Sequence, residues 1–462
     1  MTGPVQPDAP VQLEALGHNG SYHARNRLTV PDVTGTPVAE LSLVPWLFVQ
    51  RSMAALRRAD TVPADRRAAA LTLAGRAFAT ATINGLSAEN YQYVVSRVSG
   101  LPISVVRTAA ELIMYAAAEA YSTAQCARPA AAVNRWRDPT TRTGRAVWTR
   151  RGDVFAVHAA GNHPGVHALW LEALALGYRV AVRPSQREPF TPHRLISALR
   201  EAGFGADHVV LLPTDHAVAG DIIQAADLAM VYGGEDVVTK YAGTTTALAQ
   251  GPGRSKILLT GQDWRSHLDT VVTSIGNEGG TACVNTTAVF VEGDPAPVAE
   301  AIAERLSTIP SLPPEDDKAV LPVQPLAAAA AVEKFLLSRA QGTTAWLGGD
   351  GIVDNLGDGS AVLRPAVFQV GSASAPQTSI ELGFPCVWVA PWANADGVQP
   401  LRNTLVLTVI TQDEQLVERL VNEPTISNVY VGDHPTYWMR PGVPHDGYLA
   451  EFLMRTKAVI RD

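Results

Sequence analysis

The stretch Val154-Phe-Ala-Val-His158 begins the part of the chain that decides the fold. It is a β-type run, 154–159, and a helical run at 164–176 follows it. The same alternation then repeats, with strands expected at 179–183, 209–212 and 228–232 and helices at 192–202, 220–225 and 235–242. Strands that alternate with helices predict βαβ units and a parallel, doubly wound sheet. Such a sheet usually binds a ligand at the carboxyl ends of its strands.

A second alternation begins at Lys256-Ile-Leu-Leu-Thr260. It includes a helix expected at 297–308 and strands expected near 405–410 and 427–431. The run 326–334 is rich in alanine and also predicts a helix. This second alternation therefore predicts a second α/β domain.

The chain before residue 154 is expected to differ. Residues 1–38 mix Pro, Gly, Asn and Thr, which is typical of a loose arm laid over the body. From 39 to 132, Ala, Leu and Arg recur at helical spacing, and Ser87 is placed to cap one of the helices. Two β-like runs then flank Arg150-Arg-Gly-Asp153, which predicts a hairpin.

Composition excludes several classes of protein. The chain has 462 residues, which predicts two or three domains. Its net charge of −7 comes without blocks of like charge, so no nucleic-acid groove or membrane surface is expected. The N-terminus has no signal-peptide pattern, and no run of about 18 apolar residues exists to span a bilayer.

The cysteines are few and far apart. Cys126, Cys283 and Cys386 form no Cys-x-x-Cys pair, so neither a disulfide framework nor a structural zinc site is expected. We expect no bound metal. A reducing, cytoplasmic location fits this usage best.

Cys283 stands at the end of a small-residue run, Asn277-Glu-Gly-Gly-Thr-Ala-Cys283, just before a β-branched strand. An attacking thiol needs room around it, and glycines let backbone and substrate come close. Backbone N–H groups near such a bend can also point at a developing oxyanion. The alternative interpretation is a buried cysteine beside a tight turn.

Two segments between strands and helices are candidate cofactor contacts. Arg183-Pro-Ser185-Gln186 offers a cation and hydroxyls to a ribose or a phosphate, and Gly233-Gly234 would let a pyrophosphate approach closely. A Pro-rich connection and an ordinary Gly-Gly turn explain the same residues equally simply.

Three further polar residues bear on the chemistry of the candidate site. Asn162 lies between a strand and a helix, where its amide can donate to an oxyanion formed at Cys283; it also suits a helix-start turn. Glu381 can place a carboxylate on a ribose, or lie in a surface turn. His445, beside Asp446 in a Pro-Gly loop, is interpreted as structural and is left out of the chemistry.

The order and spacing of these segments resemble the aldehyde dehydrogenase superfamily over nearly the whole chain. The run ending in Asn162-His-Pro is similar to Pro-Trp-Asn-Phe-Pro, and Gly280-Thr-Ala-Cys283 is similar to Gly-Gln-x-Cys. The other matches are Arg183-Pro-Ser-Gln with Lys-Pro-Ser-Glu, Glu201-Ala-Gly-Phe-Gly with Glu-Ala-Gly-Leu-Pro, Tyr232-Gly-Gly with Thr-Gly-Ser and Glu381-Leu-Gly-Phe-Pro with Glu-x-Phe-Gly-Pro. Each match is loose, but six in the family's order are specific together.

The resemblance implies an α/β fold of the aldehyde dehydrogenase type, with a Rossmann-type cofactor domain, a catalytic domain and a β-hairpin oligomerisation arm. The expected parts are an N-terminal arm at 1–38, an NAD(P)-binding domain at 39–141 and 154–256, a catalytic domain at 257–439 and the oligomerisation arm at 142–153 and 440–462. It further implies a homodimer or homotetramer.

One departure from the family pattern shapes the expected reaction. Hydrolytic members keep a glutamate in Leu-Glu-Leu-Gly-Gly, and the matching run here is taken as Ile257-Leu-Leu-Thr-Gly-Gln262, with Leu259 at the glutamate's position. Leucine cannot act as a general base. The tail Pro441-Gly-Val-Pro-His-Asp-Gly447 also looks like that of the luciferase-associated fatty acyl reductases.

The resemblance therefore favours NADPH-dependent reduction of an acyl thioester, such as an acyl-CoA, to an aldehyde through a thioester on Cys283. The alternatives are an aldehyde dehydrogenase that forms an acid, and a non-enzymatic member of the family. An acyl-activating partner protein is expected only by analogy with the fatty acyl reductases.

Gln186 stands in place of a glutamate that would repel a 2′-phosphate, and it is flanked by the cations Arg183 and Arg187, so the site favours NADP over NAD. The acyl group is not identified, and the sequence offers no account of how the Cys283 thiolate forms.

Overall fold

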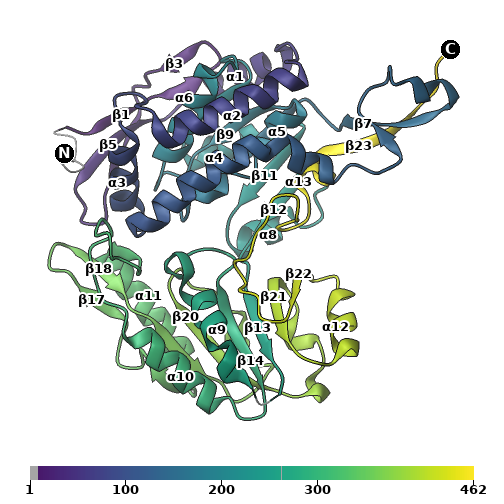
Figure 1. Ribbon diagram of the computed structural model, residues 1–462. Coiled ribbons are helices and arrows are strands. Elements are labelled where there is room, and N and C mark those ends of the chain that lie inside the picture. Colours follow the sequence, from purple (N-terminus) through teal and green to yellow (C-terminus); the bar gives the residue numbers. More distant parts are fainter. Residues whose placement is uncertain (1–8, 262) are drawn as a thin grey trace.

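The computed structural model describes residues 9–261 and 263–462 of the chain (Figure 1). The first eight residues of the expected N-terminal arm, and Gln262 of the run 257–262, therefore lie outside the described residues. Figure 1 shows two α/β bodies, one above the other, and an arm that projects from their side.

The upper body contains the predicted parallel, doubly wound sheet. Its strand order is β12-β11-β8-β9-β10-β2-β3, and the neighbours from β12 to β10 pair in parallel. These strands are β8 (Val154–His158), β9 (Arg179–Arg183), β10 (Val209–Leu211), β11 (Leu228–Tyr232) and β12 (Ala247–Gln250). The prediction for this part of the chain is confirmed.

The connecting helices also lie close to their predicted positions. They are α5 (Leu171–Leu176), α6 (Phe190–Glu201), α7 (His216–Ala225) and α8 (Glu235–Tyr241). The helix expected from residue 164 begins instead with a 3-10 turn, Pro164–His167. A proline and a glycine open that turn, and His163 caps it.

The expected helical region is confirmed as four helices, α1 (Trp46–Arg58), α2 (Ala64–Thr80), α3 (Ala88–Ser99) and α4 (Ile103–Cys126). Ser87 caps α3 as predicted, because its hydroxyl accepts a hydrogen bond of 3.1 Å from the N–H of Asn90. Helices α2 and α4 pack together over the upper sheet (Figure 1).

The prediction of a loose N-terminal arm is wrong for the described residues. This segment forms the strands β1 (Val11–Leu13), β2 (Ala15–Gly17), β3 (Gly20–Tyr22), β4 (Arg27–Pro31) and β5 (Pro37–Ser42). Strand β2 pairs with β10 and so extends the upper sheet, while Leu13 and Leu41 are buried in the core. Pairing between strands satisfies the backbone N–H and C=O groups of this segment, although its Pro and Gly content alone suggested an irregular structure.

The lower body contains the second predicted α/β unit. Its strand order is β16-β19-β20-β14-β13-β21-β22, parallel from β19 to β22. The strands are β13 (Ser255–Leu259), β14 (Thr286–Glu292), β16 (Thr344–Leu347), β19 (Ala366–Gln369), β20 (Cys386–Trp392), β21 (Thr404–Ile410) and β22 (Ile426–Val431). Helices α9 (Leu268–Gly276), α10 (Ala296–Ser307), α11 (Leu326–Arg339) and α12 (Glu414–Val421) accompany this sheet.

The predicted hairpin around residues 150–153 does not form. Strand β7 (Arg145–Arg150) pairs with β6 (Ala132–Val133) and β23 (Met454–Val459), whereas β8 belongs to the upper sheet. The backbone of Arg151 donates to Leu453 and that of Asp153 accepts from Arg179, so these residues connect two sheets. The turn-like composition of residues 150–153 does not indicate these distant strand partners. Whether this three-stranded arm joins subunits stays a prediction.

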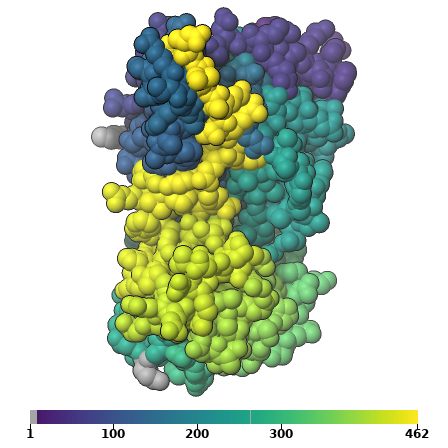
Figure 2. All heavy atoms as spheres, turned by 90° about the vertical axis from the view of Figure 1, so that its right-hand side faces the viewer, coloured from purple at the N-terminus to yellow at the C-terminus, as the bar shows by residue number. Residues whose placement is uncertain are grey.

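The C-terminal segment connects the lower body to the arm. Figure 2 shows it running from the lower body, across the middle of this face, to the top beside the strand β7. Along the described chain, no helix has both the length and the hydropathy that crossing a bilayer requires.

One ionic cluster connects the two bodies on the side of α3. The guanidinium of Arg97 donates to Asp32 (2.6 Å) and to Glu315 (2.7 Å). Asp32 is fully buried, and Arg97 is largely buried. Burying a carboxylate is costly unless a partner stays in place.

We expect Arg97→Ala to destabilise the fold by about 3 kcal/mol, because it leaves Asp32 buried without its cation. The urea midpoint of unfolding measures the effect. The matched control is Arg107→Ala, which removes an exposed pair with Asp317 (2.7 Å) and should cost no more than about 1 kcal/mol. Equal shifts in the two variants would contradict this account.

Candidate active site

Cys283 lies in the loop between α9 and β14, where two glycines permit close packing. Gly280 has a φ of +68°, and a Cβ there would lie 2.4 Å from the backbone N of Pro385. A Cβ on Gly253 would lie 1.9 Å from the carbonyl oxygen of Cys283. Glycine is therefore required at both positions. These contacts bring the segments around Gly253 and Pro385 against the cysteine loop.

Asn162 faces this loop from the upper body. Its amide Nδ2 donates a hydrogen bond of 3.3 Å to the carbonyl oxygen of Thr281, two residues before Cys283. The structure thus brings together the two residues that the sequence predicted for the chemistry. The role of Asn162 as an oxyanion donor stays a prediction.

The thiol of Cys283 is poorly disposed to ionise by itself. Burial raises its pKa to about 12, and the carboxylate of Glu381 acts in the same direction. At neutral pH the group is therefore a thiol, whereas the nucleophile is the thiolate. The site needs a base.

His445, interpreted from the sequence as structural, is the titratable side chain in contact with this thiol and is a candidate for that base. Its Nε2 lies 3.6 Å from the Sγ of Cys283. Burial lowers the pKa of His445, opposed by the Asp446 carboxylate, so the ring is neutral at pH 7 and can accept a proton. For this contact the thiol is assigned as the donor, which places the ring proton on Nδ1.

The loop around His445 is held in place by the edge strand β22. Asn428 donates to the carbonyl oxygen of His445, and the hydroxyl of Ser427 donates to Asp446 (2.9 Å). His445 is 162 residues away from Cys283 in the chain. No local pattern signals such a pairing, although the resemblance had already drawn attention to the tail 441–447.

Glu381 lies beside the cysteine loop but is already engaged. Its carboxylate accepts the backbone N–H of Arg254 at 2.6 Å, and burial raises its pKa. Its influence on the pKa of Cys283 places it near the thiol. Binding of a cofactor ribose by Glu381 stays a prediction.

Leu259 does not occupy the position expected from the sequence. Strand β13 runs parallel to β14, with Ser255 beside Thr286 and Leu259 beside Val291. Cys283 precedes β14, and the hydroxyl of Ser255 donates to its carbonyl oxygen (3.0 Å). Leu259 is therefore at the opposite end of the sheet, buried in the core. The placement of Leu259 at the glutamate's position is therefore wrong, and Leu259 gives no information about hydrolysis at Cys283.

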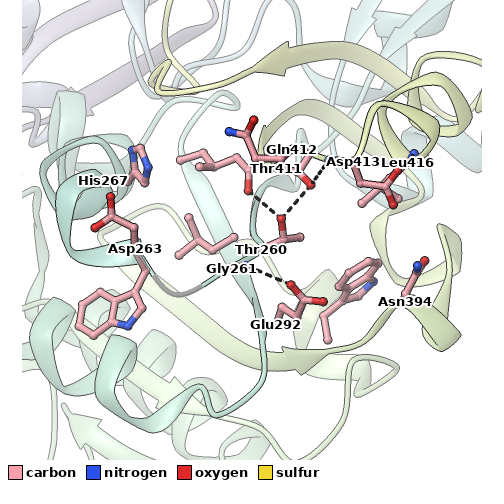
Figure 3. A pocket seen from close by; sticks show the side chains of 14 residues that line it. Thr260, Gly261, Asp263, His267, Glu292, Asn394, Thr411, Gln412, Asp413 and Leu416 are labelled. Atoms are coloured by element: carbon pink, nitrogen blue, oxygen red, sulfur yellow. Dashed lines mark hydrogen bonds between the residues drawn. The ribbon is translucent and has the colours of Figure 1, made fainter.

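A cavity of about 440 Å³ lies at that opposite end, and it is separate from the cysteine site. Figure 3 shows Glu292 accepting the N–H of Gly261 (3.0 Å), and Thr260 donating to Thr411 (2.8 Å). Cys283 and His445 do not line it.

The upper sheet has its topological switch point between β8 and β11, because the chain goes from β8 to β9 and β10 on one side and returns to β11 on the other. Ligands bind at such points in open α/β sheets. Asn162 follows β8, and the predicted Gly233 and Gly234 follow β11. The loops after β8 and β11 therefore lie at the same edge of the sheet, and Asn162 in the first of them contacts the Cys283 loop through Thr281.

The residues at this edge fit a dinucleotide. At the end of β8, His158 has a buried Nε2 with no hydrogen-bond partner in the described chain. Burial lowers its pKa to about 3, with Arg183 adding to the effect, so the ring stays neutral. A Cβ on Gly161 would lie 2.2 Å from the hydroxyl of the predicted Ser185. A bound NAD(P) would thus find close backbone approach and an unpaired ring nitrogen.

The predicted cations are used within the protein. Arg183 is buried, and its Nε and Nη2 donate to the hydroxyl (3.0 Å) and carbonyl (3.2 Å) of Thr214. Gln186 donates to the same carbonyl (3.3 Å), and Arg187 donates to Ser99 (2.9 Å). The argument for two free cations beside a 2′-phosphate is therefore weakened.

We expect His445→Asn to slow alkylation of Cys283 by iodoacetamide at pH 7 by about 100-fold, the low end of the usual contribution of a general base. The wild-type rate should level off above the lowered pKa of His445, whereas the variant's rate should keep rising about tenfold per pH unit towards the raised pKa of Cys283. Mass spectrometry of the alkylated peptide follows the reaction.

The matched control is His434→Asn, which changes an exposed histidine of the same loop. It should leave both the rate and its pH profile unchanged. Identical profiles for wild type and His445→Asn would remove His445 from the mechanism.

The fold matches solved aldehyde dehydrogenases at low sequence identity. The indole-3-acetaldehyde dehydrogenase of P. syringae, solved with NAD⁺ and IAA, is 17% identical with a TM-score of 0.81, and the match covers 98% of this chain and 97% of that one. An NAD-dependent aldehyde dehydrogenase from Sinorhizobium meliloti is 16% identical, with a TM-score of 0.82 and 99% and 97% covered. Aldehyde dehydrogenase 21 from Physcomitrella patens, solved with succinate, is 15% identical, with a TM-score of 0.79 and 98% of each chain covered.

No curated protein sequence matches the chain. The family model described as "Aldehyde dehydrogenase family" matches residues 49–455, which is most of the chain. With the expected fold present and Asn162 in contact with the Cys283 loop, the chain belongs to the aldehyde dehydrogenase family and is an NAD(P)-dependent oxidoreductase of aldehydes.

Proposed function

We propose that the protein oxidises an aldehyde to a carboxylic acid with NAD(P)⁺, through a thioester on Cys283. The observation that carries this proposal is the contact of 3.6 Å between the Cys283 thiol and His445. It is the element of the site that turns a buried thiol with a raised pKa into a nucleophile. The similar solved structures are named as aldehyde dehydrogenases, which favours the oxidative direction.

The first half of the reaction forms a covalent bond to the aldehyde. The Sγ of Cys283 attacks the carbonyl carbon while its proton passes to Nε2 of His445. The amide of Asn162 and the backbone N–H of Cys283 hold the oxyanion; loss of one such donor typically costs about 100–1000-fold in rate. When bound, the nicotinamide cofactor accepts the hydride that leaves this carbon.

The second half releases the acid. Because the pKa of His445 is lowered, its imidazolium returns its proton to solvent readily at pH 7. The neutral ring can then take a proton from the water that attacks the thioester carbonyl. The carbon–sulfur bond breaks, and Cys283 is released. The sum is aldehyde, water and NAD(P)⁺ to acid, NAD(P)H and a proton.

The second candidate is the reduction of an acyl thioester by NAD(P)H, which uses the same residues in reverse. Its support is that both carboxylates flanking Cys283 are engaged: Glu381 with Arg254, and Glu278 with His163. Neither carboxylate is therefore free to act as a base that activates water. An acyl-activating partner belongs to this candidate alone.

Oligomerisation through the arm is also part of the proposal. The edge strand β23 carries one free side of a three-stranded sheet, and an exposed edge can pair with another subunit.

The two candidates differ in their dependence on CoA. We expect aldehyde with NAD⁺ or NADP⁺ to give NAD(P)H and free acid at steady turnover without CoA. The absorbance of the reduced cofactor and analysis of the acid measure the reaction. Cys283→Ala should abolish turnover, because it removes the sulfur that forms the thioester. Turnover that needs CoA, with an acyl-CoA as the product, would instead establish the second candidate.

We expect Gln186→Glu to lower kcat/KM for NADP⁺ by at least tenfold relative to NAD⁺, because a carboxylate at this position would repel a 2′-phosphate. The readout is the ratio of kcat/KM for the two cofactors. Glu201→Gln, on the outer end of α6, is the control. An unchanged ratio in Gln186→Glu would show that residue 186 does not face the ribose.

A further inference from the structure

A histidine and a glutamate that the proposed reaction does not use lie between the two catalytic loops. The Nε2 of His163 is 3.3 Å from Oε2 of Glu278. Nδ1 of His163 accepts a hydrogen bond of 3.0 Å from the N–H of Gly165, so Nε2 carries a proton and faces the carboxylate. The N–H is not aligned well enough for a regular hydrogen bond, so the contact is a close electrostatic one.

The backbone of Glu278 is held in an unfavourable conformation. Its φ of 51° and ψ of 32° are left-handed, a conformation that is unfavourable for a residue with a Cβ. Strain of this kind persists where surrounding contacts impose it, and it clusters at functional sites. Here it directs a carboxylate towards His163.

The charge of Glu278 is stabilised by the same contact. Burial alone would raise its pKa, but the electrostatic interaction with His163 outweighs burial, and the net pKa is lowered. Glu278 is therefore an anion at neutral pH. His163 itself is buried.

The position of this pair in the chain relates it to both reacting groups. His163 directly follows Asn162, and Glu278 opens the turn that leads to Cys283. The one hydrogen bond from Asn162 to the cysteine loop, to Thr281, is long at 3.3 Å. The contact of His163 with Glu278 is a second connection between the two loops, and it involves the Glu278 carboxylate.

We propose that His163 and Glu278 are positioning residues, whose contact holds the Asn162 amide against the Cys283 loop and so sets the geometry of the oxyanion site. The inference rests on the proposed use of Asn162 as the oxyanion donor. Neither residue touches the substrate. Their loss misplaces the donor for a tetrahedral oxyanion but leaves the thiol and its base in place.

Two reactions of Cys283, attack on an ester carbonyl and alkylation, together distinguish this positioning role from a general structural role. Hydrolysis of p-nitrophenyl acetate passes through an oxyanion on Cys283 and needs no cofactor, whereas alkylation by iodoacetamide forms no oxyanion. We expect His163→Ala and Glu278→Asn each to slow release of p-nitrophenolate by about 100-fold. The alkylation rate should change by no more than about threefold in both variants. Asparagine tolerates the left-handed backbone, so the second variant removes the carboxylate without adding strain.

Two further variants test the contact itself. The double variant should be no slower than either single variant, because one contact is lost in each case. His163→Gln offers an amide donor to Glu278 and should restore part of the rate. The matched control is His267→Ala, which removes a similar contact with Asp433 (3.2 Å) in the lower body. It should leave both rates unchanged.

If the two substitutions reduce the esterase rate multiplicatively in the double variant, the proposal is overturned. It is also overturned if the single variants lose alkylation rate in parallel with esterase rate and unfold at a lower midpoint temperature. If wild type hydrolyses the ester but does not turn over aldehyde, the proposed function fails while the positioning role is still measured. If the variants keep full esterase rates while wild-type aldehyde oxidation is confirmed, the positioning role fails alone.

Discussion

The chemistry that we propose for this protein depends on the approach of His445 to Cys283. Burial of the cysteine excludes water from the thioester but raises the pKa of the thiol to about 12. A buried thiol can react only if a neutral base lies within reach. The same burial lowers the pKa of His445, so one physical cause both creates the need for a base and keeps that base unprotonated.

Much of the surrounding structure serves to bring this pair together. The cysteine arrives on a loop before β14, and the histidine on a segment tied to β22, the edge strand of the same sheet. The missing Cβ atoms of Gly253 and Gly280 let the neighbouring backbones close around the loop. The tail that carries His445 then continues into β23 and the arm (Figure 2), so the base is coupled to the part of the chain that we propose joins subunits.

The two bodies contribute different halves of the site. The switch point of the upper sheet provides a cleft suited to a dinucleotide, and the amino edge of the lower sheet provides the nucleophile. Asn162, on the upper side of the division, reaches Thr281 on the lower side. A reaction between a bound cofactor and Cys283 therefore requires that the loops of the two bodies stay in register, and this is the purpose we infer for His163 and Glu278.

The errors made from the sequence have a common origin. The run 257–262 looked like the segment that carries an activating glutamate, but strand direction places Leu259 at the far end of the sheet from Cys283. The runs around residues 150–153 looked like a hairpin, but each strand has its partners elsewhere in the chain. In both cases the local composition correctly indicates β-structure, but it does not indicate the direction of the strand or the strand with which it pairs.

The sequence by itself determined the α/β class, the positions of most helices and strands and the presence of two alternating units, and it singled out Asn162 and Cys283 as candidates for the chemistry. These follow from periodicity and from short-range spacing, which act along the chain. Only the tertiary structure decided that Arg183 is used within the protein, that the N-terminal segment joins a sheet, and that His445 faces Cys283. Those facts depend on contacts between residues far apart in the chain, and no local pattern encodes which distant side chain will fill the space beside a buried thiol.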